Sequence, residues 1–63
     1  MQRGDLVIYT TDPLLYGKLL VIAVNADGRL ECEQVHPDQR GEYARELFHA
    51  QELELAETWK AAA

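Results

Sequence analysis

"KLLVIAVNADGRLECEQV", residues 18–35, is the stretch that decides the fold. Leu19 to Val24 is an unbroken aliphatic run, rich in the β-branched types that suit a strand. Asp27-Gly28 then provides a tight turn, because glycine adopts the positive φ that hairpin turns require. The returning segment alternates apolar and acidic residues, which places one face in a core and the other in water. The stretch predicts a β-hairpin with strands at 18–26 and 29–35.

Segments before and after this hairpin extend the β-structure. Residues 6–11 follow a Gly-Asp turn signal and are rich in β-branched and aromatic residues, which predicts a first strand. Residues 12–17, Asp-Pro-Leu-Leu-Tyr-Gly, are expected to form a loop, because proline breaks the strand. Residues 36–41 are rich in turn formers and predict a connection after the hairpin.

The segment 42–57 is open to two interpretations. Its composition favours a helix, but Gly41 supplies no N-cap and Leu53-Glu54-Leu55 alternates as a strand does. We expect a short strand over 45–49, a single 3₁₀ turn over 50–52 and a last strand over 53–56. These elements predict an all-β fold, a small five-stranded SH3-like barrel, whose closure protects the strand edges.

Chain length limits the core of this fold. At 63 residues the chain is one domain, whose core is marginal without disulfides, a metal or partners. Cys32 is the single cysteine, so no internal disulfide forms. We expect the barrel to span residues 1–57 and a tail to span 58–63. Ala61 to Ala63 resemble the remnant of a cloning junction and carry no argument.

Charge and hydropathy disfavour several classes of partner. The net charge of −5 and the six dispersed basic residues disfavour nucleic acid and anionic lipid. The chain opens without the apolar core of a signal peptide, and no segment approaches the ~20 apolar residues that span a bilayer. An unpaired thiol agrees with a reducing compartment. We expect a cytoplasmic protein that does not bind membranes.

The aliphatic run predicts an interface as well as a strand. Side chains of a strand alternate between its faces, so only one half of the run can line the core. The other half exposes a contiguous apolar patch, which a two-fold contact with a second copy would cover. The outward set, which is the expected homo-oligomer interface, is Leu20, Ile22 and Val24. The alternative is a sharply bent strand whose two faces are both partly covered by other segments of the chain.

Three tyrosines, Tyr9, Tyr16 and Tyr43, are the candidate binding residues. They lie in segments that can converge in an SH3-like barrel. Such a cluster could hold a proline-rich or extended peptide, with acids such as Asp12 and Glu42 contacting a basic residue of the peptide. The simpler interpretation, which we favour, places the tyrosines at the edge of the core.

No pattern in the sequence predicts catalysis, a metal site or a cofactor. Cys32, His36 and His49 are the only soft ligands and lack the spacing of a zinc site. Cys32 and His36 would lie roughly 13 Å apart on a strand, too far for proton transfer. The glycines are scattered singly and form no phosphate loop. We therefore expect a non-enzymatic protein in which Cys32 is a small core residue.

Three short motifs resemble the small bacterial YodC-like proteins. They are GDLV (4–7), VIAVNADGRLEC (21–32) and ELFHAQELEL (46–55). The family pattern is Gly-Asp-x-Val, an Asp-Gly hairpin followed by a Cys, and an aromatic residue and a Leu near the C-terminus. The resemblance spans about residues 4–55 and implies an SH3-like fold without an established activity. This chain departs from it at Thr11 to Leu15, where those proteins usually carry a Ser-Gly-Gly-Pro turn.

GDLV and LECEQVHP (30–37) are also similar to the plasmid-borne type II dihydrofolate reductases. Those short SH3-like barrels form a tetramer around a central pore, which carries a Val-Gln-Ile-Tyr stretch. Here His36-Pro37 is followed by Asp-Gln-Arg-Gly-Glu-Tyr, so this catalytic motif is missing. The similarity therefore implies a fold and no reductase activity.

From these features we expect a small interaction module that acts as a homo-oligomer, of the kind often encoded on mobile elements. The alternative is a small-molecule binder or a pore-type enzyme assembled at an oligomer axis. A ligand-sized polar channel along that axis would distinguish the alternative from the interaction module.

Overall fold

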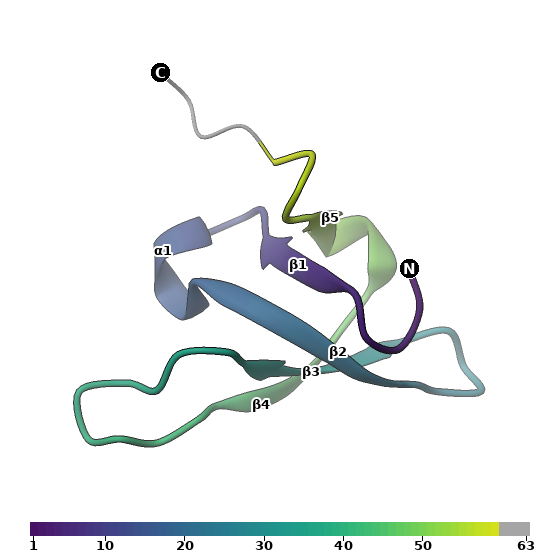
Figure 1. Ribbon diagram of the computed structural model, residues 1–63. Helices are drawn as coiled ribbons and strands as arrows, with labels where there is room; N and C mark the ends of the chain where they lie inside the picture. The colour runs from purple at the N-terminus through teal and green to yellow at the C-terminus, as the bar shows by residue number, and fades with distance from the viewer. Residues whose placement is uncertain (60–63) are drawn as a thin grey trace.

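The computed structural model describes residues 1–59 and contains one antiparallel sheet of five strands (Figure 1). The strands are β1 (Leu6–Tyr9), β2 (Lys18–Val24), β3 (Leu30–Gln34), β4 (Arg45–Phe48) and β5 (Leu53–Leu55). A one-turn helix, α1 (Pro13–Tyr16), joins β1 to β2, and a 3₁₀ helix, η1 (Ala50–Glu52), joins β4 to β5. The prediction of a mostly β fold with five strands and a 3₁₀ turn before the last strand is confirmed.

The strand order is β4-β3-β2-β1-β5. Each neighbouring pair is antiparallel, and within residues 1–59 no ladder joins β4 to β5. Closure into a barrel is therefore not seen in the hydrogen-bonded sheet. The chain itself connects the two edge strands, because only His49 and η1 separate β4 from β5.

Residues 12–17 form a turn of helix where the sequence predicted only a loop. Pro13 occupies the first helical turn, where its missing N–H costs no hydrogen bond. Gly17 ends the turn at a φ of 67°, which a side chain would disfavour. The turn lets the chain leave β1 and enter β2 in the opposite direction.

The β2–β3 hairpin is closed at its tip by hydrogen bonds. The Asn25 N–H donates to the Arg29 carbonyl at 2.8 Å, and the Gly28 N–H donates to the Asn25 carbonyl at 2.9 Å. The Arg29 backbone N–H and guanidinium both donate to the Asp27 carboxylate, and these bonds lower the pKa of that carboxyl. The predicted turn at Asp27-Gly28 is confirmed.

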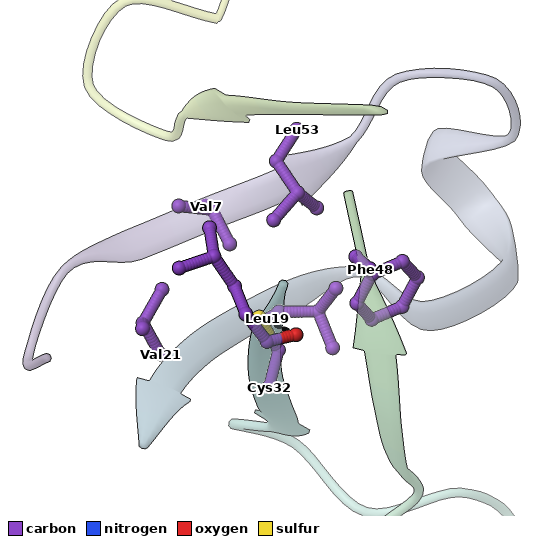
Figure 2. Close-up of a cluster of buried hydrophobic side chains, with 7 residues drawn as sticks. Val7, Leu19, Val21, Cys32, Phe48 and Leu53 are labelled. Atoms are coloured by element: carbon purple, nitrogen blue, oxygen red, sulfur yellow. Dashed lines mark hydrogen bonds between the residues drawn. The ribbon is translucent and has the colours of Figure 1, made fainter. Parts of the chain in front are cut away.

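The core lies inside the curve of the sheet and receives side chains from every strand (Figure 2). Its buried members are Val7, Leu19, Val21, Leu30, Cys32, Phe48 and Leu53. Leu30 and Cys32 are buried while Glu31 and Glu33 are only partly covered, so the predicted alternation in β3 is confirmed.

The C-terminal segment continues beyond β5 as a turn. The Trp59 N–H donates to the Leu55 carbonyl at 3.0 Å. Ala61 to Ala63, which resemble a cloning remnant, lie outside the described residues. No helix among residues 1–59 is long and apolar enough to cross a membrane.

Candidate interaction surface

The face of the sheet that points away from the core carries apolar side chains from neighbouring strands. Because Val7 and Leu19 point into the core, Leu6 and Leu20 point outward. Leu6 pairs with Leu20 across β1 and β2, so the two side chains are direct neighbours. The outward row across four strands reads Leu6, Leu20, Glu33 and Arg45.

Beside this row the surface has a shallow depression of about 330 Å³, which we call the apolar hollow. Its lining residues are Leu20, Glu33, Gln34, Val35 and Tyr43. Leu20 is 36% exposed and Tyr43 is 51% exposed, so both present apolar surface to solvent. Three separate chain segments therefore combine to form one apolar site.

Charged groups border the apolar hollow. The Arg45 Nη2 and Glu33 Oε2 atoms lie 3.3 Å apart, and both side chains are partly exposed. Such a pair contributes little to stability in water. It neutralises the one carboxylate that lines the hollow, so the hollow is suited to an apolar contact.

A β-bulge divides the predicted interface set Leu20, Ile22 and Val24. Val21 pairs with Cys32 but Ala23 pairs with Glu31, so Ile22 is an extra residue in β2. After the bulge Val24 pairs with the buried Leu30, which assigns Val24 to the core side of the sheet even though it is 51% exposed. Leu20 remains on the outward face, and Ile22 is half-buried at the bulge.

Sequence reasoning missed the neighbours that Leu20 has on this face. The outward position of Val35 could have been predicted from the sequence, because Val35 follows Glu31 and Glu33 at the same spacing of two residues. Leu6 could be found only from the register of β1 against β2. Tyr43 was a candidate binding residue, but no local pattern predicts that it lies beside Leu20, because it reaches the hollow from the connection that precedes β4.

The structure brings two of the three predicted tyrosines together. The Tyr9 and Tyr16 ring centroids lie 5.7 Å apart, and both rings contact Phe48 at 5.2 and 5.6 Å. The Tyr16 ring meets the other two rings edge-on, and the Tyr9 and Phe48 rings are tilted by 45°, as is typical of packed core aromatics. Burial raises the pKa of the Tyr16 phenol, and the Glu46 carboxylate adds to this effect. Tyr43 belongs to the apolar hollow and not to this cluster.

The remaining candidates for chemistry are the soft ligands and a second depression. Among residues 1–59, no group of three or more His, Cys, Asp or Glu side chains could hold a metal ion. Burial raises the pKa of the Cys32 thiol to about 11, so the thiol is protonated at neutral pH and is a poor nucleophile. A second depression, of about 400 Å³, is lined by Gly4, Asp5, Leu6, Lys18, Leu55, Ala56 and Glu57.

Comparisons with known proteins identify no relative of this chain. No family model matches it, and no match was found among curated proteins or solved structures. The resemblances to the YodC-like proteins and the type II reductases therefore rest on short motifs. What the structure supports of them is a small sheet of five antiparallel strands.

Proposed function

We propose that this chain is a small non-enzymatic interaction module that self-associates through the outward face of its sheet, with Leu20 at the centre of the contact. The observation that supports this most directly is the apolar hollow together with the adjoining Leu6. Exposed apolar side chains from separate segments meet there, and contiguous patches of this kind mark interaction sites.

The size of the molecule supports a second copy as the partner. The accessible surface of the chain is 4608 Å². A standard dimer contact buries about 800 Å² per partner, which is roughly one sixth of this surface. The core contains a handful of large side chains, and chains this short gain stability by association. A second copy also provides an identical apolar face without any additional component.

We also propose that the sheet closes into a small barrel. The strand order, the one-turn link between β4 and β5 and the single core shared by five strands support an SH3-like barrel. In that arrangement the edges of β4 and β5 protect each other. The outward face then remains as the surface available for a partner. We also propose that the protein is cytoplasmic.

Replacing Leu20 with lysine tests this function. The change places a charge at the centre of the proposed contact, so we expect self-association to weaken at least about 100-fold. Light scattering and sedimentation at micromolar concentration would give a wild-type mass of twice 7.2 kDa and a monomeric Leu20→Lys variant.

Two lysine variants provide matched controls for the added charge. Ala26 lies exposed in the hairpin turn, and Val24 is assigned to the other side of the sheet. We expect Ala26→Lys and Val24→Lys to associate as the wild type does. A wild type that remains at 7.2 kDa at tens of micromolar would overturn the proposal.

A further inference from the structure

Two leucines of α1 project into solvent. Leu14 is 95% exposed and Leu15 is 56% exposed, and we call this pair the leucine knob. Leu14 is the most exposed large apolar side chain among the described residues. At this exposure Leu14 contributes little packing to the fold, and about half of Leu15 is also open to solvent, so the knob is available for contact with another molecule.

The backbone beneath the knob is held in place from both ends. The Leu15 N–H donates to the Asp12 carbonyl at 3.1 Å, and the Gln34 side-chain amide donates to the Tyr16 carbonyl at 3.0 Å. The Tyr16 ring is also packed between Tyr9 and Phe48. A side chain presented on a fixed backbone loses less entropy on binding than one on a flexible loop.

The helix that carries the knob is hydrogen-bonded to Gln34, a residue that also lines the apolar hollow. Its amide donates to Tyr16 at the end of α1, and its carbonyl oxygen accepts from the Ala44 N–H at 2.9 Å, one residue after Tyr43. The Val35 N–H in turn donates to the Lys18 carbonyl at 3.1 Å. Figure 1 shows α1 and the β3–β4 connection at the same end of the sheet.

We propose that the leucine knob of each copy inserts into the apolar hollow of a second copy, in a reciprocal two-fold contact. This inference rests on the proposed self-association and identifies the side chains that make the contact. Because α1 is hydrogen-bonded to a residue that lines the hollow, and because a two-fold axis makes the two insertions equivalent, one contact can satisfy both at once. The hollow, at about 330 Å³, is larger than the roughly 150 Å³ cavity that holds a benzene ring, so leucine side chains fit.

Charge complementarity supports a second copy as the occupant. Asp12 immediately precedes the knob helix, and Lys18 borders the hollow through its backbone contact with Val35. In a reciprocal contact the acidic flank of each knob approaches the basic border of the other hollow. A second copy supplies a hollow for each knob and a knob for each hollow, so it covers both features.

A complementation experiment tests the reciprocal contact. The knob variant is Leu14→Ser with Leu15→Ser, and the hollow variant is Val35→Glu. All three positions are exposed, so both variants should retain the wild-type circular dichroism spectrum. We expect each variant alone to self-associate at least about 100-fold more weakly than the wild type in sedimentation equilibrium.

The equimolar mixture of the two variants is the decisive measurement. A mixed dimer contains one intact knob and one intact hollow in contact, so we expect it to form about tenfold more tightly than either variant dimer. A mixture no tighter than its components would overturn reciprocal insertion. A dimeric knob variant would overturn the role of the leucines and leave the proposed function standing, whereas a monomeric wild type would overturn both.

Discussion

Cys32 is fully buried at the centre of the core, and its ionisation links stability to pH. The pKa of its thiol rises to about 11 in the folded protein, from 9.0, because burial disfavours the thiolate. The unfolded chain therefore releases this proton at a lower pH than the folded chain does. The stability associated with the neutral thiol is complete below pH 9 and decreases as the pH rises towards 11.

We predict that Cys32→Ala removes this dependence. Two pKa units correspond to roughly 3 kcal/mol, so the wild type should lose up to about that free energy of unfolding between pH 9 and 11. The variant lacks the thiol, and although it is less stable overall, its stability should decrease less over this range. Urea unfolding of both proteins at each pH gives the comparison, and parallel pH curves would contradict the prediction.

At the level of elements, the β2–β3 hairpin depends on one glycine. Gly28 has a φ of 89°, and a Cβ there would meet no atom within 4 Å, so any cost of a side chain comes from the backbone. We predict that Gly28→Ala destabilises the protein by about 1–2 kcal/mol. Gly28→Asn should cost less, because asparagine tolerates positive φ better. Thermal unfolding ranks the three proteins, and an alanine variant as stable as the wild type would contradict this.

The hairpin also shows which elements a sequence can predict. The turn and the alternation in β3 have local signals, and both are confirmed. The 3₁₀ turn at Ala50–Glu52, which was expected only as the link between two short strands, is confirmed as well. The bulge at Ile22 has no local signal. In an unbroken aliphatic run, a shift by one residue places equally apolar side chains on both faces, so the pattern does not reveal it. It was therefore impossible to see that Val24 leaves the face of Leu20. The one-turn helix α1 did have a signal, since Pro13 follows Asp12, the residue at the N-cap position.

For the whole molecule, the candidate site depends on long-range register more than on any motif. Tyr43 and Leu20 lie 23 positions apart in the chain and meet only because β3 lies between β2 and β4. Similarly, Gln34 connects α1 to the start of β4 through its side chain. The sequence could indicate that β2 has an excess of apolar residues, but the neighbours that turn this excess into a hollow come from the topology.

Net charge then determines how self-association responds to salt. Each copy carries a charge of −5, so two copies repel each other at long range while their apolar faces attract at contact. Salt screens the repulsion, because the Debye length falls from about 30 Å at 0.01 M to about 8 Å at 0.15 M. We therefore predict that self-association tightens by about tenfold over this range, as sedimentation equilibrium in sodium chloride would measure. A basic partner on the same face would show the opposite dependence, since salt weakens attraction between unlike charges. Self-association that weakens as salt is added would mean that ion pairs, and not the apolar hollow, hold the two copies together.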